Sequence, residues 1–267
     1  MRRLSLALLA AVSTIALTQF ASAADLPVRA PVYKAPVMVP VYDWTGFYVG
    51  GNVGYSWGRS STDGTLTNAA TGALIGTGSD TNNLNGVIGG GQIGYNWQIT
   101  NWVLGIEADI QGSGQKGSSS AVCVGCGDGP SNITTSLDQK LTWFGTVRGR
   151  LGMTVTPTIL AYVTGGLAYG EVTTDGTISG PTVATPSGTA TFSASSTNVG
   201  WTIGGGVEGV ISGHWTAKLE YLYMDLGTVS GGPYTTPILG TTRNPLAASF
   251  SSKVTDNIVR VGINYKF

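Results

Sequence analysis

Hydrophobic residues recur at every second position in eight successive segments of this 267-residue chain. In the clearest segment, one face carries Phe47, Val49, Gly51, Val53, Tyr55 and Trp57. Consecutive side chains of a β-strand point to opposite faces, so this alternation predicts strands with one apolar and one polar face. The other segments are 87–99, 102–110, 141–153, 159–169, 199–211, 215–223 and 259–267. The weakest is 159–169, whose outer face is assigned to Val163, Leu167 and Tyr169.

The connections between these segments alternate strictly between short and long. The short ones lie at 100–101, 156–158 and 212–214, and the long ones, rich in Gly, Ser, Thr and Asn, lie near 59–85, 112–138, 173–196 and 227–256. Membrane barrels have this asymmetry, whereas a soluble barrel or sandwich has no reason for it. The sequence therefore predicts an all-β fold: an eight-stranded antiparallel up-and-down transmembrane β-barrel with short periplasmic turns and four long external loops over residues 44–267.

Charged residues identify the face that points into the barrel. They make up only 10% of the chain, and eight of those within the predicted strands are assigned to the interior, opposite the apolar face: Glu107, Asp109, Arg148, Arg150, Glu208, Lys218, Glu220 and Arg260. A cation facing lipid at the bilayer midplane costs about 2–4 kcal/mol. The apolar face also carries aromatic residues at both strand ends, as at the two interfaces of a membrane. We therefore expect the charged face to point inward.

The interior charges balance, with four acidic and four basic residues. We expect them to pair at similar heights, since a lone charge inside a narrow barrel would be poorly solvated. The expected pairs are Glu107 with Arg148, Glu208 with Lys218 and Glu220 with Arg260, bridged by Tyr48, Asn52 and Gln92. Eight strands leave a lumen just wide enough for side chains to fill. This favours a filled interior over the alternative, a charged and conductive pore lining.

The N-terminal segment indicates export. Arg2 and Arg3 precede an apolar run over 4–17, and a small-residue site with Ala21 and Ala23 lies after it. This pattern predicts a signal peptide over 1–23, cleaved after Ala23. The run is shorter than the roughly 20 apolar residues that a membrane-spanning helix needs.

The mature chain is expected to begin with a proline-rich segment and to carry little net charge. Four prolines recur over 24–43, which predicts an extended periplasmic linker. Without Arg2 and Arg3 the formal net charge of zero becomes minus two. Because no basic surplus is available, nucleic acid is not an expected partner.

Three segments resemble a known family. They are Asp43–Tyr55 (DWTGFYVGGNVGY), Thr164–Gly170 (TGGLAYG) and Lys218–Tyr223 (KLEYLY). They are similar to strands of the small opacity-type, OmpA-like outer-membrane proteins of α-proteobacteria. The resemblance implies an OmpA-type barrel at the cell surface, of the kind called porin-like or surface antigen. Some members bind hemin, but no residue here matches a hemin-ligand motif, so that activity is not transferred.

The C-terminus matches the assembly signal of outer-membrane barrels: a polar residue, a glycine and two aromatics, the last at the terminal position. Here these are Arg260, Gly262, Tyr265 and Phe267. The alternative is an ordinary amphipathic strand that ends there. We expect the barrel-assembly machinery to engage Tyr265 and Phe267.

Cys123 and Cys126 form a C-x-x-C pair in the second long connection. No βαβ pattern surrounds them, as a thioredoxin-like redox motif would require. A metal site would need two further ligands, and the sole histidine, His214, is expected at the periplasmic end. In an exported protein a local disulfide is the expected state, with two free thiols as the alternative.

These features favour a structural and surface-interaction protein over an enzyme. External-rim catalysis would need a histidine beside a serine or carboxylate there, and no catalytic, metal or cofactor site is expected. The alternatives are a narrow channel for ions or small solutes and a hemin- or host-binding surface protein. Expected partners are outer-membrane lipids including lipopolysaccharide and the assembly machinery, with peptidoglycan or a host surface as further candidates.

Overall fold

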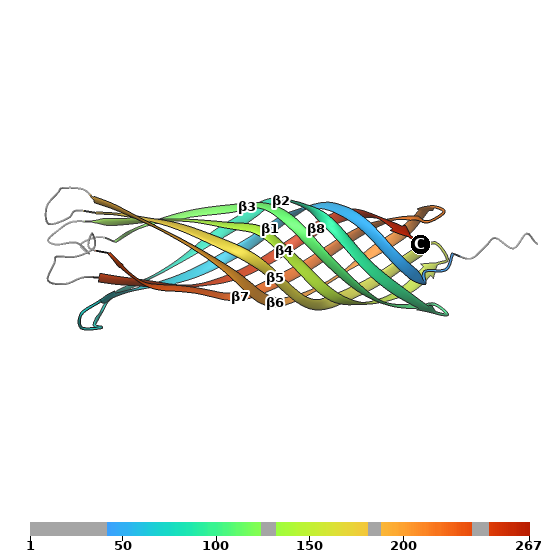
Figure 1. Ribbon diagram of the computed structural model, residues 1–267, viewed down its shortest axis with the longest axis horizontal. Helices are drawn as coiled ribbons and strands as arrows, with labels where there is room; N and C mark the ends of the chain where they lie inside the picture. Colours follow the sequence, from blue (N-terminus) through green and yellow to red (C-terminus); the bar gives the residue numbers. More distant parts are fainter. Residues whose placement is uncertain (1–41, 124–131, 181–187, 237–245) are drawn as a thin grey trace, which may run out of the picture. The chain divides into compact units, whose positions relative to one another are not determined.

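The computed structural model describes residues 42–123, 132–180, 188–236 and 246–267, and these form a single closed antiparallel barrel (Figure 1). Its strands are β1 (Gly46–Asn68), β2 (Leu74–Ile99), β3 (Trp102–Cys123), β4 (Ile133–Thr156), β5 (Ile159–Gly180), β6 (Gly188–Ser212), β7 (Trp215–Thr236) and β8 (Leu246–Lys266). Each strand pairs with its sequence neighbours, and β1 also pairs with β8, which closes the ring. The predicted fold class is confirmed. Across these described ranges no helix is long and apolar enough to cross a membrane.

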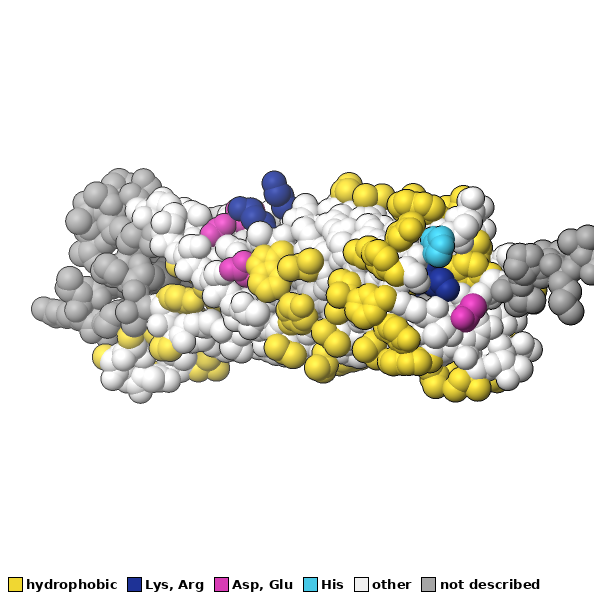
Figure 2. All heavy atoms as spheres, turned by 45° about the vertical axis from the view of Figure 1, so that its right-hand side comes forward, with side chains coloured by type: hydrophobic (Ala, Val, Ile, Leu, Met, Phe, Trp, Pro, Cys, Tyr) yellow, Lys and Arg dark blue, Asp and Glu magenta, His cyan; other side chains and the backbone are white. Residues whose placement is uncertain are grey.

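The outer surface of the barrel carries an apolar belt (Figure 2). Large hydrophobic side chains that a soluble protein would bury point outward along all eight strands, for example Val53 and Val163, each 60% exposed. Aromatic rings cluster at both borders of the belt. Tyr265 lies 5.1 Å from Trp215 at the short-turn end, and Trp201 lies 5.5 Å from Tyr223 at the other end. A belt between two aromatic girdles is the surface of a barrel that lies in a bilayer.

The strands are longer than the alternation predicts, which corrects the expected extent of the loops. Residues 59–85 were expected to be a long loop, yet β1 continues to Asn68 and β2 starts at Leu74. The backbone ladder persists there, with Ser60 opposite Asn82 and Val254. Beyond the hydrocarbon both faces of a strand can be polar, so the apolar alternation disappears while Thr and Ser still support β-structure. The period-two signal therefore reports the membrane-spanning part of each strand only.

An aromatic cap closes the lumen at the short-turn end. Trp44, directly before β1, is 1% exposed and packs with Val103, Leu160 and Tyr162. The backbone N–H of Trp44 donates to Gln98 Oε1 at 2.8 Å. This hydrogen bond holds the residues directly before β1 at the short-turn end of the lumen. Tyr42 packs edge-on against Trp44 at 5.0 Å, and burial raises its pKa to about 12, so its hydroxyl stays protonated.

A second apolar layer fills the lumen farther along the strands, on the side away from the short turns. It consists of Ile88, Leu141, Phe144, Ala168, Val172, Leu222, Met224, Leu226, Val229, Val254 and Ile258, all buried. The charged residues lie between the two apolar layers. On β4, for instance, Phe144 comes after Arg148 and Arg150 in the direction of the outer end.

Candidate functional site

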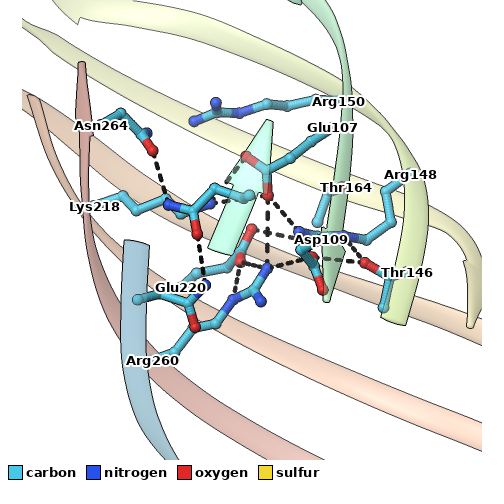
Figure 3. A network of polar contacts seen from close by, with 12 residues as sticks. Glu107, Asp109, Thr146, Arg148, Arg150, Thr164, Lys218, Glu220, Arg260 and Asn264 are labelled. Atoms are coloured by element: carbon cyan, nitrogen blue, oxygen red, sulfur yellow. Dashed lines mark hydrogen bonds and ion pairs between the residues drawn. The ribbon is translucent and has the colours of Figure 1, made fainter. Parts of the chain in front are cut away.

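The eight charged residues expected inside the barrel form one buried network, and all of them except Glu208 are labelled in Figure 3. They come from β3, β4, β6, β7 and β8, and each is at most 4% exposed. Their formal charges sum to zero. Period-two alternation places them on the inner face of each strand, and inward glycines make room for them. A Cβ added at Gly54, for example, would lie 2.7 Å from Arg260 Cβ.

Arg148 is the hub of the network. Its Nη2 lies 2.5 Å from Glu107 Oε1 and 2.9 Å from Asp109 Oδ2, and its Nη1 lies 3.0 Å from Glu220 Oε1. Its Nε donates to Thr146 Oγ1 at 2.8 Å, and that hydroxyl donates to Asp109 at 2.7 Å. A planar guanidinium presents donors in several directions, so one arginine can bridge three carboxylates.

Arg260 joins the same carboxylates from the opposite side of the lumen. Its Nη2 lies 2.6 Å from Glu220 Oε2 and 3.0 Å from Asp109 Oδ2, and its Nε donates to Glu220 Oε2 at 2.7 Å. Tyr162, on β5, donates a further hydrogen bond to Glu220 Oε1 at 3.1 Å. Charge-assisted hydrogen bonds of this kind satisfy the buried carboxylate on both oxygens.

Two of the three expected pairs are present, and the third is wrong. Glu107 contacts Arg148 and Glu220 contacts Arg260, but Lys218 Nζ binds both carboxylate oxygens of Glu107 at 2.9 Å. Glu208 instead pairs with Arg150. Glu208 and Lys218 are directly opposite in the β-ladder. Their side chains nevertheless reach across the lumen, because in a narrow barrel residues on distant strands come as close as cross-strand neighbours.

Uncharged polar groups complete the network. Tyr48 donates to Glu107 Oε2 at 2.8 Å, and the Arg150 guanidinium lies 3.7 Å from the centre of the Tyr162 ring. Three side-chain amides, those of Asn52, Gln92 and Asn264, form a chain of hydrogen bonds that ends at Glu208. Its links are Asn52 to Gln92 (2.5 Å), Gln92 to Asn264 (2.8 Å) and Asn264 to Glu208 (2.8 Å). The expected bridging by Tyr48 is therefore direct, whereas Asn52 and Gln92 act through Asn264.

The sequence did not predict several interior residues. Thr146, Tyr162 and Thr216 all hydrogen-bond to the charged groups. All three lie at inward positions of their strands, in step with the charged residues, so the alternation alone could have found them. Asn264, which the alternation places on the polar face of the last strand, is buried and donates to Glu208. A further buried carboxylate, Asp256, lies beyond the network, where Ser56 and Gln115 donate to it at 2.5 and 2.6 Å.

Some expected features lie outside the described residues. They include the signal peptide with Ala21 and Ala23, nearly all of the proline-rich linker, Cys126 and the side chain of Cys123. The disulfide and the cleavage site therefore stay predictions. His214 lies at the short-turn end, where its Nδ1 is 2.8 Å from the Lys266 carbonyl oxygen.

The four residues of the expected assembly signal divide between the two faces of β8. Arg260 and Gly262 face inward, and Tyr265 and Phe267 continue the aromatic girdle, with their ring centres 5.2 Å apart. Phe267 is 69% exposed, and its backbone N–H donates to Phe47 O at 2.9 Å, which extends the β1–β8 seam by one bond.

Removing these two aromatics should impair insertion more than it destabilises the barrel. We expect a variant that combines Tyr265→Ala with deletion of Phe267 to reach the outer membrane at less than about a tenth of the normal level. Fractionation and then a gel-shift assay of folded protein measure this. Trp215→Ala, which removes a third ring of the same girdle, is the matched control. Equal insertion of both variants would contradict a role in recognition by the assembly machinery.

An apolar exterior, a charged and buried interior and a closed ring of eight strands define an integral membrane β-barrel. The family described as "Outer membrane protein beta-barrel domain" matches residues 6–267, and the chain belongs to this family. The protein is therefore an outer-membrane β-barrel.

Curated relatives are similar over nearly their whole length. The chain is 41% identical over 258 residues to the "31 kDa outer-membrane immunogenic protein" of Brucella melitensis, covering 92% of this chain and 93% of that one. It is 32% identical to the "22 kDa outer membrane protein" of Rhizobium leguminosarum, covering 88% and 82%. Among solved structures, the attachment invasion locus protein Ail of Yersinia pestis is similar with a TM-score of 0.35 and 10% identity, covering 81% of this chain and 99% of that one.

Proposed function

We propose that this protein is a sealed barrel with a structural and surface-presenting role, rather than a channel or an enzyme. The observation that carries the proposal is the closure of the lumen by three layers in series. An aromatic cap, a charged layer with side chains at most 4% exposed and an apolar layer succeed one another along the strands. An ion would have to displace paired charges and then cross an apolar section, both of which are costly.

The outer ends of the strands are the part available to other molecules. Beyond the belt the surface is mostly polar (Figure 2), and the described outer segments are rich in Gly, Ser and Thr. Relatives of this chain are named as immunogenic proteins of the outer membrane, which supports exposure of this region and a non-enzymatic role. We expect lipopolysaccharide and other outer-membrane lipids around the belt. Contacts with peptidoglycan or a host surface would involve the periplasmic and external ends respectively.

Single-channel recording tests the proposal. Purified, refolded protein in a planar bilayer should show no steady openings at voltages where a porin conducts. The control for folding is the mobility shift on a detergent gel before and after boiling, which an intact barrel should give. Steady openings from protein that passes this control would replace the sealed barrel with the narrow channel.

A further inference from the structure

The outer end of the barrel contains a cavity that lies apart from the three layers that close the lumen. It has a volume of about 330 Å³ and is lined by residues from all eight strands, so it lies inside the extended part of the barrel. Large hydrophobic side chains are among the residues that line it, including Leu66, Leu137, Ile178, Phe192, Tyr234 and Phe250. This volume is at the lower end of the range for small-molecule sites.

The floor of the cavity is closed. Thr62, which lines it, lies 2.9 Å from Ser252 Oγ, and Ser60 and Gln139 contact the same hydroxyl at 2.6 and 3.3 Å. Below this polar layer lies the apolar layer that contains Val254. The cavity is therefore a blind site that is separate from the charged network.

Three aromatic rings line the cavity and stack against one another. The Phe192 ring lies 5.1 Å from that of Tyr234 with an interplanar angle of 20°, and Tyr234 lies 6.2 Å from Phe250 at 13°. Glycines on neighbouring strands make this arrangement possible. Phe192 is opposite Gly176 and Phe250 is opposite Gly231, and a Cβ at either glycine would collide with the ring. The Phe192 and Phe250 rings therefore lie over these two glycines.

The charge of the cavity limits the ligand. Among the described residues that line it, Asp80 is the one charged group, and none is Lys, Arg or His. An anion would lose hydration without gaining a cationic partner, and it would be repelled by the carboxylate. A planar apolar molecule would gain burial and offset stacking against the three rings.

From these features we propose that the outer cavity is a binding site for a small, uncharged, flat apolar molecule of one or two fused or linked rings. The site does not depend on whether the barrel conducts. Binding of such a molecule and conductance are separate measurements, so either proposal can fail alone.

Two fluorescent probes with nearly the same ring system test both parts of this proposal. N-phenyl-1-naphthylamine is neutral, and 8-anilino-1-naphthalenesulfonate carries an anionic group. Folded protein in lipid nanodiscs, corrected for empty nanodiscs, should bind the neutral probe saturably with one site. It should bind the sulfonate at least about tenfold more weakly, because the anion is desolvated without a partner.

Variants locate the bound probe. The double variant Phe192→Ala/Phe250→Ala should weaken binding of the neutral probe at least about tenfold, since two stacking partners are lost. Gly78→Trp should block the cavity without disturbing its wall, because a Cβ at Gly78 meets nothing within 4 Å. Phe47→Ala, which removes a 50% exposed ring from the lipid-facing surface, is the matched control and should bind normally.

The possible results divide clearly. Loss of binding in both cavity variants, with retention in Phe47→Ala, supports the site, and Gly78→Trp keeps the test valid if the double variant does not fold. Equal binding by all variants would place the probe in the lipid or on the belt. Absence of saturable binding by folded wild-type protein would also overturn the proposal. Equal affinity for the sulfonate would overturn its restriction to uncharged ligands.

Discussion

Replacing Arg148 by methionine should lower the free energy of unfolding by about 3–5 kcal/mol, as expected when one partner of a buried ion pair is removed. Arg148 lies within 3.0 Å of three carboxylates, and its side chain is fully buried. Without it, three cations remain to balance four carboxylates inside the barrel. Equilibrium unfolding by urea in lipid vesicles, monitored by tryptophan fluorescence, measures the loss.

Lys140→Met is the matched control for that substitution. Lys140 forms an ion pair with Asp175 at 3.3 Å, but its side chain is 46% exposed. Exposed pairs contribute at most about 1 kcal/mol, so this variant should unfold almost like the wild type. Equal losses in the two variants would mean that water reaches the charged layer, and the case for a filled lumen would fail.

Charge reversal adds a test of the connections within the network. Arg148→Glu should be more damaging than Arg148→Met, and adding Glu107→Arg should recover only part of the loss. Full recovery would be expected if Glu107 and Arg148 formed an isolated pair. The structure instead places Asp109 and Glu220 beside Arg148 as well, and both would face the introduced carboxylate.

The sequence predicted the lipid-facing residues of the barrel better than the arrangement of the side chains inside its lumen. A strand in a bilayer must be apolar outside, so the period of two identifies the lipid-facing residues, even on β5, where Val163 and Leu167 are each 60% exposed as expected. The inner face has no such requirement. It accepts charged, polar or apolar residues, provided that the polar ones find partners.

Partner choice inside the lumen depends on distances that the sequence does not contain. Strand register places Glu208 opposite Lys218, as counting from the turns predicts. Their actual partners, Arg150 and Glu107, lie on β4 and β3. Such contacts depend on the width and tilt of the whole barrel, whereas sequence spacing describes only neighbouring strands.

The inner apolar layer was missed for a related reason. Phe144 and Leu222 lie at inward positions, next to charged residues of the same strand. An interpretation that assigns the apolar face to lipid and the polar face to the lumen has no place for them. The sequence still holds one indication of this layer. Where a strand alternates clearly, its odd and even positions separate the two faces, and an apolar residue at an inward position indicates a packed lumen.

Phe144→Ala tests this layer directly and should lower the free energy of unfolding by about 3–5 kcal/mol. Phe144 is fully buried among other apolar side chains. Truncation would remove its burial and leave a cavity that the rigid wall cannot close. The same urea titration in vesicles measures the change.

Phe47→Ala removes an identical side chain from the outer face of the barrel, where Phe47 is 50% exposed and its ring centre lies 5.8 Å from that of Tyr95. It should cost less, about 1.5–3 kcal/mol, since only the transfer of the ring from water is lost. Lipid chains are fluid and fill the space outside, whereas nothing mobile and apolar can reach the space inside. The difference between the two variants therefore measures the cavity at Phe144.

Conductance adds an independent result for the same pair. Phe144→Ala should remain silent in a planar bilayer, because the charged layer next to it, with Arg148 fully buried, still closes the lumen. If Phe144→Ala costs no more than Phe47→Ala, water must already occupy the lumen at that level. If Phe144→Ala also conducts, the inner apolar layer alone closed the lumen in the wild type. The charged layer next to it would then form part of an ion path.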